Sequence, residues 1–307
     1  MKTETLSFYA TAVESALRRI ASGLDDALDL AALARAAALS PLHFHHVFRG
    51  MVGETPLEVH RRLRLERAAV RLATGDGQVV RVAFEAGYET HESFTRAFRQ
   101  AYAVSPSEYR ARARAALACG AAPAHWLAAR CGLHFGAEPA LAFHPPHPQG
   151  ADPMDVEILE LPELTVAAVR HTGPYPTISR AFERLGSVAA RAGLFALRGA
   201  TMVATYHDDP EATPAAELRS DAGLVIPRGT RLPEELAELR LPAGRYACTL
   251  HRGPYTLLGD TWARLMGEWL PASGHRVGAG VSLEVYRNDP STAAPADLLT
   301  EIRVPLA

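Results

Sequence analysis

Two stretches fifty residues apart share one pattern, which decides the fold of the first half: PLHFHHVFRGMVGETP, Pro41–Pro56, and HESFTRAFRQAYAVSP, His91–Pro106. Four positions coincide in register: two phenylalanines four apart, an arginine directly after the second, and a proline seven residues later. Residues four apart lie on one face of an α-helix, so each phenylalanine pair forms a buried stripe and leaves the opposite face free. The repeat therefore predicts two similar helices, each with a face available for a partner.

Each of these helices is preceded by a shorter one, so the pattern is helix, tight turn, helix, twice. The four expected helices are Asp29–Ala37, Pro41–Met51, Gln78–Ala86 and His91–Ala101. Ser40 supplies an N-cap before Pro41 at the first helical position. In the second copy Gly87 can adopt the left-handed conformation of a tight turn, and either Glu89 or Thr90 caps the helix that follows. Two helix-turn-helix units are therefore expected.

The free faces of the two second helices carry side chains that can recognise DNA. These candidates are His43, His45, His46 and Arg49 in the first copy, and His91, Glu92, Thr95, Arg96 and Arg99 in the second. Their polar groups can donate to or accept from base edges, and arginine can address guanine through two hydrogen bonds. Five arginines are also candidates for phosphate contacts: Arg49, Arg61, Arg62, Arg81 and Arg99. The alternative for any single arginine is an ordinary solvated helix surface.

A metal site is a weaker interpretation of the histidine cluster. His43 and His46 are three apart and share a helix face, but no acidic or thiol partner lies nearby in sequence to complete a ligand set. His144 and His147, in a proline-rich stretch, are similarly weak candidates. We therefore expect neither a metal nor a cofactor.

The composition suits two folded domains. Of the 307 residues 48% are hydrophobic and 21% charged, and no apolar run approaches the roughly 18–20 residues of a membrane span. We therefore expect no membrane partner, and a cytoplasmic protein because the first twenty residues lack an export signal. The three separated cysteines are expected to be ordinary buried thiols. Residues 1–115 carry sixteen Lys and Arg against thirteen Asp and Glu, and the remainder sixteen against twenty-one, so only the first part suits a polyanion.

The second half contains a duplicated strand–turn–helix unit. LPELTVAAVRHTGPY from Leu161 recurs eighty residues later as LPAGRYACTLHRGPY from Leu241. Alternation and helical spacing predict strands and helices around these motifs. The expected strands are Asp155–Leu161, Leu164–Val169, Thr201–Tyr206, Tyr246–Leu250 and Val281–Tyr286, and the helices are Thr177–Ala192 and Leu257–Leu270. Before them, Pro, Gly and His cluster at Ala137–Met154, and the expected linker covers residues 116–153.

Two such units facing each other would form a cleft between their helices and a shared sheet. Aromatic side chains available to line it are Tyr175, Phe182, Tyr255, Trp262 and Trp269. Aromatic residues at helical spacing also serve as plain core, and Trp262 and Trp269 are seven apart on one helix. Both interpretations stay open for these residues.

Glu284 is the candidate that gives the cleft its chemistry. In the alternating strand around it, Leu283 and Val285 share one face, so Glu284 and Tyr286 share the other. A carboxylate between aromatic walls favours an amphipathic cation. The alternative is a glutamate that faces water on the outer side of an antiparallel sheet.

The first half resembles the DNA-binding domain of the AraC/XylS family over nearly all of Leu24–Arg114. The resemblance rests on LHFHHVFRGMVGETPLEVHRRLRLERAAVRLATG, on VVRVAFEAGYETHESFTRAFRQAYAVSPSEYRAR, and on the spacing of the units. It implies that two recognition helices enter successive major-groove segments on one face of the DNA. His46 stands where the resemblance implies arginine, so base readout by the first helix is expected to be weaker or dependent on pH.

The second half resembles the GyrI-like effector-binding domains. The resemblance rests on MDVEILELPELTVAAVRHTGPY, the second HRGPY, and LEVYRNDPSTAAPADLLTEIRVPL. It implies that the glutamate of the Leu-Glu-x-Tyr strand, Glu284, helps to bind cationic hydrophobic compounds. The expected fold is multidomain: an all-α double helix-turn-helix domain over residues 1–115, the linker, and an α+β duplicated strand-helix-strand effector-binding domain over 154–307.

These features predict a sequence-specific DNA-binding transcription regulator that senses a small molecule and is not an enzyme. The expected partners are promoter DNA, a small-molecule effector and RNA polymerase. Some GyrI-like proteins resemble hydrolases, so one alternative is a C-terminal domain that hydrolyses or sequesters reactive small molecules, with Glu284 and a nearby tyrosine as acid or base. A third possibility is inhibition of another protein by this domain.

Overall fold

The computed structural model describes residues 2–136 and 153–307 and divides the chain into two compact units. Of the described residues, the first unit contains 2–9, 30–50 and 153–307, and the second contains 10–29 and 51–136. The first helix-turn-helix unit therefore groups with the C-terminal domain, whereas the second lies in the other unit. Among the residues described, no helix is long and apolar enough to cross a membrane.

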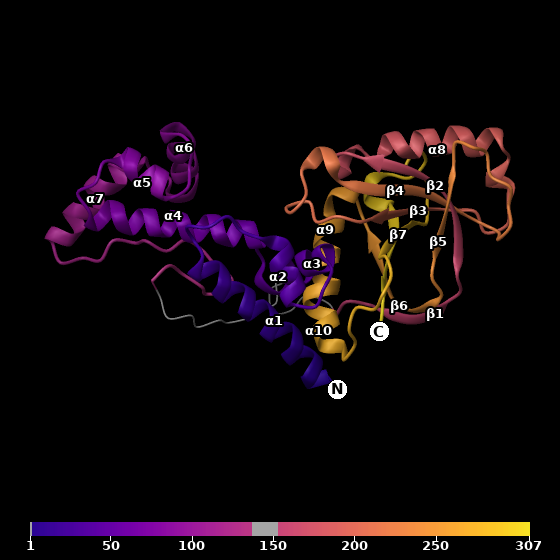
Figure 1. Ribbon diagram of the computed structural model, residues 1–307, viewed down its shortest axis with the longest axis horizontal. Helices are drawn as coiled ribbons and strands as arrows, with labels where there is room; N and C mark the ends of the chain where they lie inside the picture. Colours follow the sequence, from indigo (N-terminus) through magenta and orange to yellow (C-terminus); the bar gives the residue numbers. More distant parts are fainter. Residues whose placement is uncertain (1, 137–152) are drawn as a thin grey trace. The chain divides into compact units, whose positions relative to one another are not determined.

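The N-terminal part is helical throughout (Figure 1). Its helices are α1 Lys2–Ser22, α2 Leu30–Ala36, α3 Pro41–Val52, α4 Pro56–Thr74, α5 Val79–Glu85, α6 His91–Tyr102 and α7 Pro106–Ala118. All four predicted helices are present, with ends that differ from the prediction by at most one residue. The two helix-turn-helix units are α2–α3 and α5–α6.

Local hydrogen bonds explain where these helices begin and end. The backbone N–H of His43 donates to the Ser40 hydroxyl, and the Thr90 hydroxyl accepts from the backbone N–H of Ser93, so Thr90 is the cap of α6. Gly87 has the expected left-handed conformation, with φ +78°. Ala38 adopts the same region in the first turn, with φ +54°, a conformation that is strained for a residue with a Cβ atom.

The second helix-turn-helix unit has its own core. Phe94 and Phe98 are fully buried there, 5.4 Å apart between ring centroids, with Tyr109 of α7 against Phe98. In the other unit Phe44 and Phe48 are equally buried. The predicted inward stripes are therefore confirmed in both copies.

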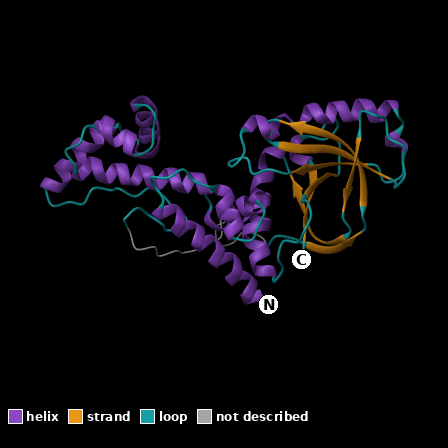
Figure 2. Ribbon diagram, viewed as in Figure 1, coloured by secondary structure: helices purple, strands orange, loops and turns teal. Residues whose placement is uncertain are grey.

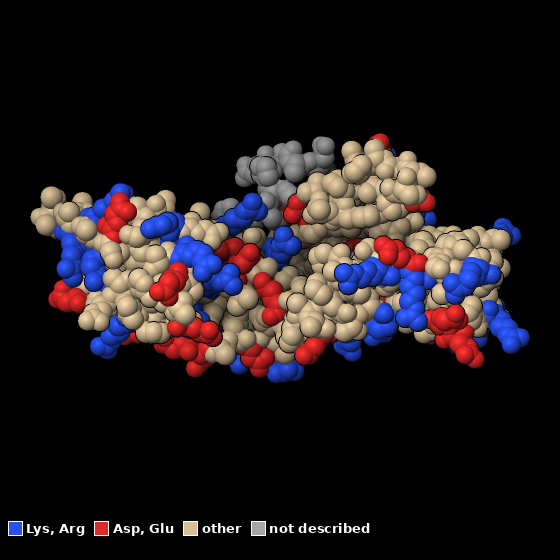
Figure 3. Space-filling model, turned by 90° about the horizontal axis from the view of Figure 1, so that it is seen from above, with Lys and Arg blue, Asp and Glu red and all other residues tan. Residues whose placement is uncertain are grey.

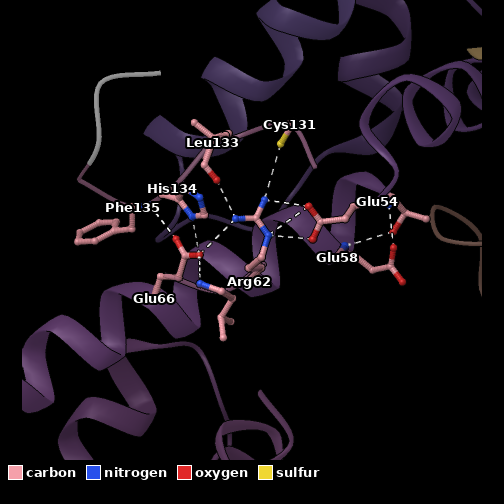
Figure 4. Close-up of polar contacts among 10 residues, drawn as sticks. Glu54, Glu58, Arg62, Glu66, Cys131, Leu133, His134 and Phe135 are labelled. Carbon is pink, nitrogen blue, oxygen red and sulfur yellow. Dashed lines mark hydrogen bonds and ion pairs between the residues drawn. The ribbon is translucent and has the colours of Figure 1, made fainter. Parts of the chain in front are cut away.

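The segment after α7, expected as part of the linker, folds back onto α4. Glu66 of α4 is fully buried and accepts from the backbone N–H groups of Leu127 and Phe135, at 2.9 Å each, and from the ring of His134. Figure 4 shows this carboxylate beside the Arg62 guanidinium. Up to residue 136 the chain is thus anchored rather than a free tether. Most of the proline-rich stretch Ala137–Met154, with His144 and His147, lies outside the described residues.

The C-terminal part is one eight-stranded antiparallel sheet with helices, and its strands curl (Figure 2). Its elements are β1 Glu157–Leu161, β2 Leu164–Thr172, α8 Ser179–Arg191, β3 Thr201–Tyr206, β4 Arg219–Ile226, β5 Ala237–Leu241, β6 Gly244–Arg252, α9 Leu258–Arg264, α10 Leu270–Ser273, β7 Leu283–Tyr286 and β8 Leu299–Pro305. The predicted strands are present, but β4, β5 and β8 were missed. The helix predicted at Leu257–Leu270 contains a π-helical turn, Leu265–Trp269, between α9 and α10.

The strand order β1-β6-β8-β7-β3-β4-β2-β5 places the two repeats side by side. Strands β6, β7 and β8 of one copy correspond to β2, β3 and β4 of the other, and the copies meet where β3 pairs with β7. There Ala204 lies opposite Glu284, and Val203 opposite Val285.

One face of the sheet is covered by α8, which packs on β2 and β4, and the other face carries a second core with Leu283 and Val285. Both faces are therefore buried.

The three cysteines are free thiols. Cys131 and Cys248 are buried as expected, but Cys119 at the end of α7 is exposed. The expectation of buried thiols is wrong for Cys119, because the helix it caps ends at the surface.

Candidate DNA interface and effector site

The face of α6 opposite its phenylalanines is open to solvent. It borders a hollow of about 630 Å³, and the residues that line this hollow are His91, Glu92, Thr95, Arg96, Arg99 and Gln100. Arg96 and Arg99 are exposed, whereas the Thr95 hydroxyl oxygen is shielded from solvent. All five candidates predicted on this helix therefore share one face, and its guanidinium groups are free to approach a partner.

Charge on the drawn face of the molecule is mixed. In the space-filling view of Figure 3, Lys and Arg side chains alternate with Asp and Glu rather than forming one broad basic patch. This agrees with the modest basic excess of residues 1–115. On this face, a DNA contact would therefore depend on particular side chains more than on a general positive field.

The corresponding face of α3 is not free, in contrast to the expectation that both second helices leave a face available, and DNA contacts by its residues stay a prediction. His43 is 7% exposed and its Nε2 lies 2.9 Å from the Ser282 hydroxyl oxygen, just before β7. His45 is 6% exposed, with Nδ1 at ion-pair distance, 3.1 Å, from Oδ1 of Asp209, and this nitrogen has no hydrogen-bond partner among the described residues. Helical spacing correctly assigned these residues to a shared surface, but could not reveal that the C-terminal domain covers it.

His46 of α3 lies flat on an aromatic ring of the C-terminal domain. Its ring centroid is 4.8 Å from that of Trp262, and the two planes differ by 12°. Loss of water, with smaller contributions from His45, His43 and Arg49, holds the pKa of His46 well below its usual value. His43 and His46 thus have different partners, and the described residues contain no group of three or more His, Cys, Asp or Glu side chains suited to a metal.

Arg62 is not available for a phosphate contact, in contrast to the prediction. Its guanidinium is 6% exposed and donates to both carboxylate oxygens of Glu54, to the backbone oxygen of Leu133 and, at 3.4 Å, to Glu66 (Figure 4). An arginine held by two carboxylates and a carbonyl has its donors satisfied inside the protein. It joins α4 to the segment that follows α7.

Glu284 lies on the helix-covered face of the sheet and is 4% exposed. Its Oε1 accepts from the indole Nε1 of Trp262 at 2.9 Å, and its Oε2 accepts from the hydroxyls of Tyr286 at 3.0 Å and Tyr206 at 3.2 Å. The alternative of a glutamate that faces water is therefore wrong. A single carboxylate instead sits close to the junction of the two repeats.

Burial makes this carboxylate unusual. Loss of water raises the pKa of Glu284, and the hydrogen bonds from Trp262, Tyr286 and Tyr206 oppose the rise. Burial, and then the nearby charge of Glu284, raise the pKa of both tyrosines well above the usual value. The tyrosines consequently remain protonated donors over the range in which the carboxyl titrates.

Most of the predicted aromatic side chains gather around this carboxylate. The ring of Tyr286 is in edge contact with Phe182 at 5.4 Å and with Tyr255 at 5.5 Å between centroids. Tyr175 is in edge contact with the ring of Tyr206 at 4.9 Å. Aromatic rings from both repeats therefore surround the Glu284 carboxylate.

Trp269 does not join this group. Among the described residues no ring contact or hydrogen bond connects it to Glu284 or to Trp262. A spacing of seven places two residues on one face only in an α-helix, and the intervening π-helical turn changes the rotation per residue. Its role as a ligand contact stays a prediction.

Tyr206 is the site residue that the sequence prediction missed. It ends β3 as Tyr286 ends β7, and the signal was present: TYHDDP from Thr205 recurs eighty residues later as VYRNDP from Val285. The same alignment places Ala204 opposite Glu284 in the repeat. The two halves therefore supply matched tyrosines, but only one supplies a carboxylate.

The repeated His-x-Gly-Pro-Tyr motif makes the sharp exit from the strand that was predicted. Gly173 and Gly253 have φ +137° and +136°, a region that side chains rarely adopt. His171 bridges the hydroxyls of Ser220 and Thr177. His251 likewise lies 2.7 Å from the Thr261 hydroxyl. These histidines hold the turns that place the motif tyrosines.

Comparison with known proteins matches the two parts of the chain separately. The GyrI-like small molecule binding domain matches residues 154–307, and a helix-turn-helix domain matches residues 33–112. A DNA gyrase inhibitor of Yersinia enterocolitica is 35% identical over 141 residues, which are 44% of this chain and 88% of that protein. The HTH-type transcriptional regulator Rv1931c of Mycobacterium tuberculosis is 40% identical over 78 residues, 25% of this chain and 30% of that one.

Among solved structures, a hydrolase from Listeria innocua covers 52% of this chain and 94% of its own, with 15% identity and a TM-score of 0.38. A similarity this distant carries no argument about activity. The family matches cover the sheet domain and most of the helical part, including the end of α2 and all of α3, α5 and α6. The chain belongs to the GyrI-like small-molecule-binding family, and its AraC-type helix-turn-helix domain makes it a DNA-binding transcription regulator.

Proposed function

We propose that the effector of this regulator is a hydrophobic cation that binds at Glu284. The observation that carries the proposal is that this carboxylate is buried without a Lys or Arg partner in the part of the chain that the structure describes. Its hydrogen-bond donors are three neutral groups, and among the described residues no Lys or Arg side chain forms an ion pair with it, while a positive charge on His251 would lower its pKa. A buried charge without an opposite charge is unfavourable, and a cation that also packs on the aromatic rings would supply the missing charge.

We further propose that α6 reads the promoter through its exposed face. Arg96 is suited to a bidentate contact with guanine, and Arg99 to a phosphate. His91, Glu92 and Thr95 stay predicted contacts on the same face. The predicted contacts on α3, namely His43, His45, His46 and Arg49, require that this helix leave the C-terminal domain.

The DNA part is tested by substitution on α6. A binding duplex is first selected from a random-sequence pool with the full chain, and affinity for it is then measured by fluorescence anisotropy. Arg96→Ala should weaken binding by about ten-fold or more and relax specificity at one base pair. Arg112→Ala is the matched control, because Arg112 on α7 is exposed and pairs with Glu108 in the preceding turn. Equal losses for both variants would contradict base recognition by Arg96.

The effector part is tested with a matched pair of probes. Tetraphenylphosphonium supplies aromatic rings and a positive charge, and triphenylphosphine oxide supplies similar rings without the charge. Calorimetry should detect the cation more strongly than the neutral compound, and Glu284→Gln should abolish the difference. Glu238→Gln, at a partly exposed pair with Arg240 on β5, is the control. If Glu284→Gln bound the cation as well as the unaltered protein does, the proposed site would be wrong.

We propose that the C-terminal domain binds its effector without chemical turnover. Glu284 and its tyrosines could in principle exchange protons with a ligand, so recovery of unchanged ligand after prolonged incubation is the direct test. RNA polymerase is the proposed protein partner at the promoter. The proposed location is the cytoplasm, where promoter DNA is accessible.

A further inference from the structure

Helix α3 is buried on two faces. Phe44 and Phe48 face a hydrophobic core, while His43, His46 and Gly50, spaced three and four apart, face the C-terminal domain. A recognition helix must present one of its faces to a DNA groove. In this arrangement the face that should do so is occupied.

The contact between α3 and the C-terminal domain is a close backbone crossing. A Cβ atom on Gly50 would lie 2.3 Å from the backbone oxygen of Ala263 and 2.6 Å from Cα of Gly267. A Cβ atom on Gly267 would lie 2.1 Å from the carbonyl carbon of Gly50. Only glycine at both positions permits this approach, and Gly267 lies within the π-helical turn that follows α9. Such fit marks a specific interface rather than a loose encounter.

Trp262 connects this interface to the effector site. Its indole Nε1 donates to Glu284, and the face of the same ring is stacked against His46. A hydrophobic cation drawn to Glu284 needs the aromatic faces beside it. The imidazole of His46 therefore occupies a surface that the effector would use.

We propose that α3 and the effector compete for Trp262, so that the docked helix silences the first helix-turn-helix unit and the effector releases it for DNA. The inference rests on the proposed effector site at Glu284. A ligand shifts an equilibrium only when it binds one state better than the other, and here it binds the state in which α3 has left. Coupling is reciprocal, so the effector strengthens DNA binding and DNA strengthens effector binding by the same factor.

The test uses a glycine substitution that separates α3 from the domain without altering α6 or Glu284. Gly267→Ala forces a methyl group into the backbone of Gly50. Gly186→Ala is the matched control: Gly186 is also a helical glycine of the C-terminal domain, on α8, and a Cβ atom there meets nothing within 4 Å. Ser282→Ala removes only the hydrogen-bond partner of His43, so it is a second variant that should weaken the contact of α3 to a smaller extent.

Two measurements on the full chain report the release of α3. The first is modification of His43 and His45 by diethyl pyrocarbonate, measured by peptide mass spectrometry with His91 as internal reference. The second is affinity for the selected duplex. Gly267→Ala should raise both the histidine modification and the DNA affinity at least about five-fold, because the added methyl group overpacks the contact. Ser282→Ala should raise the same two quantities about two- to ten-fold. Gly186→Ala should match the unaltered protein, and circular dichroism verifies that each variant is folded.

Adding tetraphenylphosphonium should accelerate modification of His43 and His45 in the unaltered protein, but not in Glu284→Gln. If calorimetry shows that the cation binds while both histidines stay protected, the competition is refuted and the effector site stands. If Gly267→Ala and Ser282→Ala expose the histidines without raising DNA affinity, α3 docking does not silence the protein. If the cation does not bind at all, the proposed effector class fails, and the glycine variant still decides whether docking inhibits DNA binding.

Discussion

Acidification should release α3 from the C-terminal domain, because docking removes water from His43. Burial of this imidazole lowers its pKa from 6.5 to about 4. A histidine with a lower pKa in the docked state favours docking only while it is neutral. Its contribution is fully present above pH 6.5, and is lost progressively as the pH falls from 6.5 towards 4.

The size of the effect follows from these two pKa values. At pH 5.5 the released imidazole is protonated about ten to one, whereas the docked imidazole is almost entirely neutral, so docking weakens by about 1.4 kcal/mol, or about ten-fold. His46, whose pKa is also lowered, and the positive charge of Arg49 act in the same direction. The carboxylate of Asp209 lies 3.1 Å from His45 at the same interface.

The assay compares DNA affinity of the unaltered protein and Gly267→Ala at pH 7.5 and 5.5, at constant ionic strength. At pH 7.5 the unaltered protein should bind DNA more weakly than Gly267→Ala does, and at pH 5.5 the two affinities should be nearly equal. Histidines outside the interface, such as His91, are the same in both proteins, so their effect cancels in the ratio. A gap that is constant between the two pH values would refute the reasoning.

Three further outcomes are expected. Arg62→Ala should lower the free energy of unfolding by about 3–5 kcal/mol, because it leaves Glu66 buried without its arginine; urea denaturation measures this, and an unchanged stability together with a reduced salt dependence of DNA binding would instead indicate a phosphate contact. Thr55→Ala should cost about 1 kcal/mol in the same assay, because it removes the capping box at the start of α4. Tyr206→Phe removes a hydrogen-bond donor to Glu284, so the pKa of this carboxyl should rise further. As the solution is acidified, the affinity for tetraphenylphosphonium should therefore begin to fall at a higher pH than in the unaltered protein; an unshifted calorimetric pH profile would count against the hydrogen bond.

The sequence was a reliable guide wherever the determinant is local. The phenylalanine pairs of α3 and α6, the caps at Ser40 and Thr90, and the left-handed turn at Gly87 depend on residues within a few positions of one another. The alternation around Glu284 was equally informative, because side chains in a strand alternate between the two faces.

Prediction failed where the determinant is a contact between distant segments. Strand β4 has buried residues on both faces and therefore lacks the alternation that marks a strand. Arg62 resembles a surface arginine in sequence, and only the carboxylates of Glu54 and Glu66 together with a carbonyl far along the chain make it internal. Tyr206 lies outside the His-x-Gly-Pro-Tyr motifs that mark the repeat, and its match with Tyr286 appears only at the ends of β3 and β7.

By itself, the sequence determined the two helix-turn-helix units, the duplicated sheet domain, and the placement of Glu284 with Tyr286 on one strand face. Only the tertiary structure decided that three neutral donors enclose this carboxylate and that α3 lies against Trp262. The physical reason is that periodicity specifies which side chains share a surface, whereas the free energy of burying that surface depends on what shape the rest of the chain offers to cover it.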